Sequence, residues 1–182
     1  MNATFPTPGL SDRRFTAADI QALVMKGVIR EDAKFELVGG DIVPLSPKGP
    51  RHEGMRLTVT HWIRRLPLRI ASLAETTLWL DEHNFLEPDY VLFDRSVAIA
   101  DLKASDVLLA IEVGDHSWRY DTEAKAALFA KHGVQEYWAI HAPTRLLRLH
   151  RGPSAHGWAE VKDIAAGDAV TPLHAGLPTF TL

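Results

Sequence analysis

Residues 106–141 contain the pattern that decides the fold: "DVLLAIEVGDHSWRYDTEAKAALFAKHGVQEYWAIH". The apolar run at 107–111 is typical of a strand that is covered on both faces. After a polar loop, the spacing predicts a helix over 122–133 that ends at Gly133, and then a short strand over 136–141. Strand, helix and strand in this order form a βαβ unit, so we expect two parallel strands with a right-handed crossover.

Two charged residues interrupt this pattern. Glu112 ends the apolar strand, and Lys125 lies beside Leu128 and Phe129 on the expected apolar side of the helix. Burying either charge without a partner costs several kcal/mol. Because the two residues lie one βα step apart, a shared site is one explanation for both.

The remaining chain predicts a mixed architecture. We expect a first helix with a capping box formed by Thr16 and Asp19, and a strand hairpin around Gly39–Gly40. Further elements are predicted by the same periodicities: a helix over 51–66 that ends at Pro67, strands at 77–80 and 90–93, a hairpin over 145–164 with its turn at Gly152–Pro153, and a last edge strand at 176–182. The predicted class is α/β or α+β with a mixed β-sheet.

Composition bounds the class of protein. A chain of 182 residues predicts one domain over 1–182, with 1–11 as a loose N-terminal segment. The absence of cysteine excludes disulfides, thiolate zinc sites and cysteine nucleophiles, and favours a cytoplasmic protein. The first ten residues lack the pattern of a signal peptide, and no apolar run is long enough to span a membrane. The net charge of -3 gives no general attraction to nucleic acid, so DNA binding would need local basic patches or a bound metal.

Several motifs are absent. The sequence contains no nucleophile elbow, no phosphate-binding loop, no dinucleotide fingerprint and no H-E-x-x-H motif, so no nucleotide cofactor is expected. The nine histidines are scattered and form no i, i+4 pair on a predicted helix. We therefore expect them at surfaces and helix ends rather than in a zinc site.

The chemistry that remains is a carboxylate pair. Asp89 opens one predicted strand and Glu112 closes another, so the two could share a crevice and bind a hard cation such as Mg²⁺. Lys125 is spaced i, i+4 from Asp121 and could orient an attacking water. Simpler interpretations remain open at this point: Asp89 as a turn residue, Glu112 as a solvated strand-end acid, and Lys125 in a plain helix ion pair.

At these residues the sequence resembles a known family. The segments "EPDYVLF" (87–93) and 108–141, with "FELVGGDIVPLSPKGPRHEGM" (35–55) upstream, are similar to the Uma-two family of restriction-endonuclease-like proteins. That family belongs to the PD-(D/E)xK nuclease superfamily. The resemblance covers about residues 15–141 and implies a mixed sheet flanked by helices, with a metal site on the central strands.

The resemblance also implies roles for individual residues. Asp89 and Glu112 match the two metal-binding acids, and the Val113 carbonyl would be a further ligand. The superfamily lysine should stand two residues after the acid, where this chain has Gly114; Lys125 is the lysine that matches the Uma-two pattern.

Five further residues match the family pattern. Glu36 would complete the site, and His52 is a weaker candidate for it. Asp121 would orient Lys125 or start the helix. Tyr137 and Trp138 are expected in the core.

Three functions follow as hypotheses. The first is a metal-dependent endonuclease that uses Mg²⁺, with Mn²⁺ as a substitute, to hydrolyse DNA, and a homodimer is compatible with it. The second is an inactive module of the same fold that binds nucleic acid or protein, and the third is a hydrolase of smaller phosphoesters. DNA contact would come from two arginine-rich segments, whose simpler explanation is a solvated surface: Arg51, Arg56, Arg64, Arg65 and Arg69, then Arg145, Arg148 and Arg151.

Overall fold

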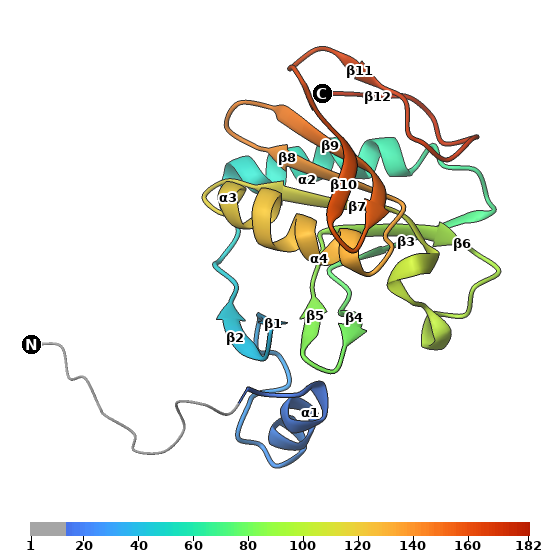
Figure 1. Ribbon diagram of the computed structural model, residues 1–182. Helices are drawn as coiled ribbons and strands as arrows, with labels where there is room; N and C mark the ends of the chain where they lie inside the picture. Colours follow the sequence, from blue (N-terminus) through green and yellow to red (C-terminus); the bar gives the residue numbers. More distant parts are fainter. Residues whose placement is uncertain (1–13) are drawn as a thin grey trace, which may run out of the picture. The chain divides into compact units, whose positions relative to one another are not determined.

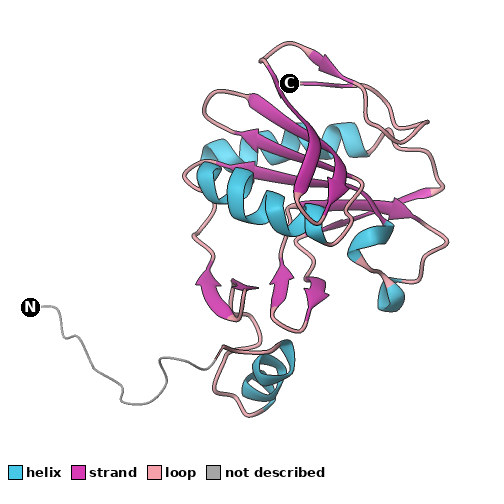
Figure 2. Ribbon diagram, in the orientation of Figure 1, coloured by secondary structure: helices cyan, strands magenta, loops and turns pink. Residues whose placement is uncertain are grey.

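The computed structural model describes residues 14–182, which form two compact units (Figures 1 and 2). The first unit comprises the described residues up to Leu45 together with Asp81–Phe85. The second comprises Ser46–Leu80 and Leu86–Leu182. The single domain expected over 1–182 stays a prediction, and the loose segment expected at 1–11 lies outside the described residues.

The first unit contains a helix and a hairpin. Helix α1 (Ala17–Met25) begins at the predicted capping box, in which Thr16 and Asp19 bond reciprocally. Strands β1 (Phe35–Val38) and β2 (Asp41–Pro44) pair antiparallel around Gly39–Gly40, as predicted. Both glycines have positive φ, which suits a tight hairpin turn. A small core is formed by Ile20, Leu37 and Phe85.

The second unit is built on a six-stranded mixed sheet in the order β10-β9-β8-β7-β6-β3. Strands β7 and β8 are parallel, as the βαβ pattern predicted, and the other neighbours are antiparallel. The bounds are β3 Ile70–Ala74, β6 Tyr90–Asp94, β7 Val107–Gly114, β8 Glu136–His141, β9 Leu146–Ser154 and β10 Gly157–Ile164. All eight residues of β7 are buried, which agrees with its continuous apolar run.

Helices cover both faces of this sheet (Figure 1). Helix α2 (Pro50–Ile63) packs its buried Met55, Val59 and Trp62 on one face. On the other face lies a helical segment made of α3 (Trp118–Tyr120), a π-helical turn η3 (Asp121–Lys125) and α4 (Ala126–Lys131). The predicted mixed sheet with flanking helices is therefore confirmed.

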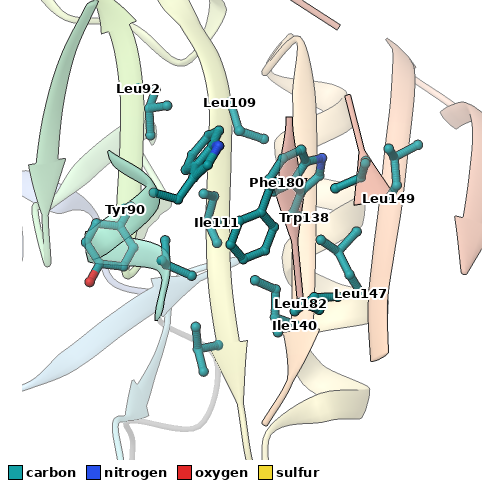
Figure 3. Packing of buried hydrophobic residues seen from close by; sticks show 14 of the residues in the cluster. Tyr90, Leu92, Leu109, Ile111, Trp138, Ile140, Leu147, Leu149, Phe180 and Leu182 are labelled. Atoms are coloured by element: carbon teal, nitrogen blue, oxygen red, sulfur yellow. The ribbon is translucent and has the colours of Figure 1, made fainter. Parts of the chain in front are cut away.

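The main core lies on the α2 face. Trp138 of β8 contacts Trp62, with 5.5 Å between the ring centroids, and Phe180, with 5.7 Å (Figure 3). Phe180 belongs to β12 (Phe180–Thr181), which pairs with β11 (Ala169–Val170). Tyr137 and Trp138 are fully buried, so their prediction as core residues is confirmed.

Several predicted boundaries were wrong. The C-terminal hairpin turns at residues 155–156, between Ser154 and Gly157, and not at Gly152–Pro153. Gly152 instead lies within β9 at positive φ, where an added Cβ would stand 2.8 Å from the Ala159 Cβ on β10. The last strand pairs with β11 in a separate two-stranded sheet.

Other elements were missed or misplaced. The third helical segment starts at Trp118, inside the predicted polar loop, and α2 ends at Ile63, before the predicted Pro67. The short strands β3 and β5 (Asn84–Leu86) were not predicted. The strands predicted at 77–80 and 90–93 are confirmed as β4 (Leu78–Asp81) and β6. The chain also contains two 3₁₀ turns, η1 (Ile99–Asp101) and η2 (Ala104–Asp106). Within residues 14–182 we find no helix with the length and apolar character needed to span a membrane.

Candidate active site

The two predicted acids lie at the same end of two neighbouring strands of the central sheet. Strand β6 pairs antiparallel with β7 so that Tyr90 stands opposite Ile111, which makes Asp89 and Glu112 the next residues along each strand. The Oδ2 atom of Asp89 accepts a hydrogen bond of 2.8 Å from the backbone N–H of Val113. Both acids are buried, with exposed fractions of 3% and 4%. The register therefore places the two acids across from each other on neighbouring strands, and their role as a metal-binding pair stays a prediction.

Lys125 reaches the same place from the helical segment. Its Nζ lies 2.7 Å from Glu112 Oε1 and 3.8 Å from Asp121 Oδ1, and the residue is 4% exposed. The Tyr120 ring lies beside the ammonium, 5.5 Å from Nζ to the ring centroid. The shortest of these ion pairs, between Lys125 and Glu112, joins the helical segment to β7. Glu112 is therefore a buried, paired acid, and the interpretation as a solvated strand-end acid was wrong. The two anomalies of the sequence thus share one buried ion pair.

Asp121 is fixed at the start of the π-helical turn. Its Oδ2 accepts a hydrogen bond of 2.6 Å from Ser117 Oγ, and its carbonyl accepts one of 3.0 Å from the Tyr137 hydroxyl. A π-helical turn contains one more residue than an α-helical turn and therefore changes the direction of the side chains that follow. Asp121 and Lys125, the first and last residues of this turn, are both buried.

Three cationic or polar side chains surround Asp89 from the start of α2. Lys48 Nζ lies 2.8 Å from Asp89 Oδ1, His52 Nε2 lies 3.2 Å from Oδ2, and Arg56 Nε lies 3.5 Å from Oδ1. Glu75 forms ion pairs with Lys48 at 3.0 Å and with Arg56 at 2.6 Å. His52 was predicted at the site, and the structure brings it there.

The sequence analysis missed Lys48 and Glu75 as members of this cluster. A signal exists for the two cationic or polar side chains of α2, since His52 and Arg56 are four residues apart, but Lys48 lies before the helix and has no such signal. Glu75 follows β3, which was itself missed, and no sequence pattern indicates its position. We call the set Lys48, His52, Arg56, Glu75 and Asp89 the Asp89 cluster.

The charges of this cluster keep Asp89 ionised. Burial by itself raises the pKa of the Asp89 carboxyl, but the His52 hydrogen bond and the Lys48 ammonium outweigh burial and lower that pKa to about 2. Burial likewise lowers the pKa of Lys48, but Asp89 and Glu75 raise it above its ordinary value. An acid that stays ionised at neutral pH is suited to binding a cation.

The donor set is one that Mg²⁺ accepts. Two carboxylates and one backbone carbonyl are hard oxygen ligands, and Mg²⁺ usually keeps several waters besides a few such ligands. Among residues 14–182, no group of three or more His, Cys, Asp or Glu side chains is placed to hold a metal ion. A hollow of about 450 Å³ lined by Ile63, Leu68 and Leu73 lies along β3 and contains none of the candidate residues.

Comparison with known proteins identifies the family. A family model described as "Putative restriction endonuclease", Uma2, matches residues 18–182. The chain belongs to the Uma2 family. A crystal structure of "a putative nuclease belonging to DUF820" from Anabaena variabilis matches 84% of this chain and 88% of its own, with a TM-score of 0.67 and 16% sequence identity. That likeness supports the fold, and no curated protein matches the chain.

The space around Gly114 explains why this Uma2 protein lacks a lysine two residues after Glu112, where the superfamily pattern has one. A Cβ added at Gly114 would stand 2.6 Å from Asp121 Oδ2 and 3.2 Å from Ser117 Oγ. No side chain fits there, because the Asp121 carboxylate occupies that space. A lysine two residues after Glu112 is therefore incompatible with the helical segment of this Uma2 chain, and the lysine that meets the acid comes from that segment.

Glu36 lies in the first unit, on β1, and is fully buried. Its role in completing the Uma2 site stays a prediction.

The arginines predicted to contact DNA are mostly engaged within the Uma2 chain. Arg148 forms two hydrogen bonds to Asp163, and Arg151 pairs with Glu136. Arg65 and Arg69 donate to backbone carbonyls of the C-terminal segment, and Arg56 belongs to the Asp89 cluster. The exposed arginines of these two segments include Arg51, Arg64 and Arg145.

Proposed function

We propose that this Uma2 protein is a Mg²⁺-dependent endonuclease that hydrolyses DNA phosphodiester bonds. The observation that carries the proposal is that the buried Asp89 and Glu112 lie across from each other at the ends of neighbouring strands, with Lys125 of the helical segment paired to Glu112. Burying three charges at a strand end is costly for stability, and such clusters are typical of functional sites. Membership of the Uma2 family supports a nuclease function.

Asp89, Glu112 and the Val113 carbonyl would hold the cation, and Mn²⁺ would substitute for Mg²⁺. Once bound, the cation would polarise the phosphate and lower the pKa of a water molecule. The backbone N–H of Val113 keeps Asp89 Oδ2 in a fixed direction, which orients the carboxylate before any ligand arrives.

Lys125 would stabilise the negative charge that develops on the phosphate. Its ammonium is held within 2.7 Å of Glu112 and is excluded from water, so its charge acts in a medium of low dielectric constant. Asp121, tied to Ser117 and Tyr137, would keep the turn that positions Lys125. His52 would hold Asp89 in place, and Glu36 is the further acid that the family pattern implies.

The test is cleavage of supercoiled and linear DNA in the presence of Mg²⁺ or Mn²⁺. We expect Asp89→Asn, Glu112→Gln and Lys125→Met each to lower the rate by about 100-fold or more, the scale of lost transition-state stabilisation. Glu36→Gln should lower the rate as well. The control is Glu123→Gln, which removes an exposed acid of the same helical segment and should cleave like the wild type. Equal cleavage by wild type, Asp89→Asn and Glu112→Gln would contradict the proposal.

One observation favours a second function. Each acid already has an internal cation, Lys48 at 2.8 Å from Asp89 and Lys125 at 2.7 Å from Glu112. A cluster neutralised in this way also suits an inactive endonuclease-fold module that binds nucleic acid or protein. That function predicts no heat of Mn²⁺ binding in calorimetry and no cleavage of DNA.

A further inference from the structure

Lys48 is a closer cation to Asp89 Oδ1 than Arg56, at 2.8 Å against 3.5 Å. It lies in the non-helical segment before α2, and its side chain is 33% exposed. Its Nζ contacts Asp89 Oδ1 at 2.8 Å and Glu75 Oε1 at 3.0 Å. A single ammonium therefore bridges two carboxylates, which is also what a divalent cation does in such a cluster.

The two oxygens of Asp89 have different partners. Oδ2 accepts from the Val113 N–H at 2.8 Å and lies 3.2 Å from His52 Nε2. Oδ1 faces Lys48 and, at 3.5 Å, Arg56 Nε, which is buried and makes no hydrogen bond. Oδ1 is therefore the oxygen that an added cation would take, and Lys48 is the group already bound to it.

The acids around Asp89 already have cations close to them. Lys48 pairs with Asp89 and Glu75, Arg56 pairs with Glu75, and Lys125 pairs with Glu112. The Lys48 ammonium lies 2.8 Å from Asp89 Oδ1, so a divalent cation bound to that oxygen would meet a like charge at close range, which favours withdrawal of the ammonium.

Lys48 is the cation that is free to withdraw into water. Lys125 is 4% exposed, and the Arg56 side chain is 17% exposed and anchored on α2 over the Tyr90 ring. The Lys48 side chain is the most exposed of the three and extends from a non-helical segment.

We infer that the Lys48 ammonium is a built-in competitor of the divalent cation at Asp89 Oδ1, so that Lys48 sets the metal affinity of this site. The inference rests on the proposed function. A cation that binds must displace Lys48. Only the small fraction of molecules in which Lys48 is already displaced can bind the cation, so the apparent metal affinity is lowered in proportion to that fraction.

The first test is titration of Mn²⁺ by calorimetry, with no DNA present. We expect Lys48→Met to bind Mn²⁺ about tenfold more tightly than the wild type. Lys162→Met is the matched control, because it removes an exposed lysine of β10 and should leave the affinity unchanged. Asp89→Asn should abolish binding with either residue at position 48. Thermal unfolding with and without Mn²⁺ shows that each variant is folded.

The second test measures Lys48 itself. Reductive methylation followed by mass spectrometry reports how accessible the Lys48 amine is. We expect slow methylation of the metal-free wild type, faster methylation when Mn²⁺ is saturating, and fast methylation of Asp89→Asn in both conditions.

The outcomes separate this inference from the proposed function. Equal Mn²⁺ affinity of wild type and Lys48→Met, with unchanged methylation of Lys48, would overturn the competition while the metal site stands. If neither protein binds Mn²⁺, the metal site of the proposed function is wrong and the inference is overturned with it.

Discussion

At the scale of single residues, the buried pair of Glu112 and Lys125 is the feature on which site and stability both depend. A buried ion pair adds little net stability, but removing one partner leaves an uncompensated charge in the interior. Glu112 and Lys125 are both nearly inaccessible to water. Replacement of either residue should therefore affect folding as well as catalysis.

We expect Lys125→Met to lower the free energy of unfolding by about 3 kcal/mol, because Glu112 loses its closest cation. Urea denaturation at neutral pH measures this. Adding Glu112→Gln to the variant should recover part of the loss, since the unpaired charge is then gone. Arg119→Met, which removes the exposed partner of Glu123, is the control and should change stability little. A loss for Lys125→Met no larger than for Arg119→Met would contradict the buried pairing.

Gly114 gives a second prediction at this scale. Gly114→Ala would bring a Cβ to 2.6 Å from Asp121 Oδ2, so it should lower the free energy of unfolding by about 1–3 kcal/mol. Gly54→Ala is the matched change, because Gly54 lies within α2 and has no atom within 4 Å of an added Cβ. It should raise stability by up to about 1 kcal/mol, since alanine favours a helix. Thermal or urea unfolding of both variants decides, and equal effects would contradict the close approach.

At the scale of elements, the segment from Trp118 to Lys131 shows what a sequence pattern can and cannot predict. The apolar spacing over 122–133 predicted the helix and its end at Gly133, which has positive φ. The pattern did not reveal the π-helical turn at Asp121–Lys125, since one extra residue in a turn leaves no compositional trace. The Asp121–Lys125 spacing of four residues was found, but the shorter contact of Lys125 is with a residue on β7.

The strands likewise include some that the sequence predicted and some that it missed or misplaced. The long β7, with its continuous apolar run, and the parallel β8 were predicted. Short β3 was missed, and with it the position of Glu75, which follows that strand and joins the Asp89 cluster. The turn of the last hairpin was misplaced, because Gly152–Pro153 is a typical turn dipeptide that here lies within β9.

At the scale of the whole molecule, the stability of the fold depends on pH through a buried histidine, His150. His150 is 2% exposed and packs beside the Tyr137 and Trp158 rings, with centroid distances of 5.1 Å and 5.6 Å. Burial lowers its pKa to about 4, although a hydrogen bond to the Tyr137 carbonyl opposes the shift. The folded protein therefore binds this proton less readily than the unfolded chain does.

The sign of the effect follows. Above its ordinary pKa of 6.5, His150 is neutral in the folded and the unfolded chain, so its titration does not change the free energy of unfolding. As the pH falls from 6.5 to about 4, the unfolded chain takes up a proton that the folded chain does not, so stability falls by up to about 3 kcal/mol. Asp89, whose pKa of about 2 lies below its ordinary 3.8, adds a loss that begins at about pH 5 and falls mostly below that window.

Urea denaturation at several pH values between 7 and about 4 checks this prediction. His150→Phe should remove most of the pH dependence in that window, whatever its effect on stability at pH 7. His156→Gln, at an exposed position, should keep the wild-type profile. The same slope in wild type and His150→Phe would show that another group is responsible.

The sequence by itself determined the type of protein and the pieces of its site. Periodicity specified the βαβ unit, and two charges in apolar surroundings, Glu112 and Lys125, marked the place of interest. What only the tertiary structure decided is which charges meet. The β6–β7 register places Asp89 across from Glu112. The helical segment brings Lys125 to Glu112 and Asp121, and the segment before α2 brings Lys48 to Asp89. The physical reason is that a periodic pattern depends on neighbours along the chain, whereas a buried charge is satisfied by partners that folding brings from elsewhere.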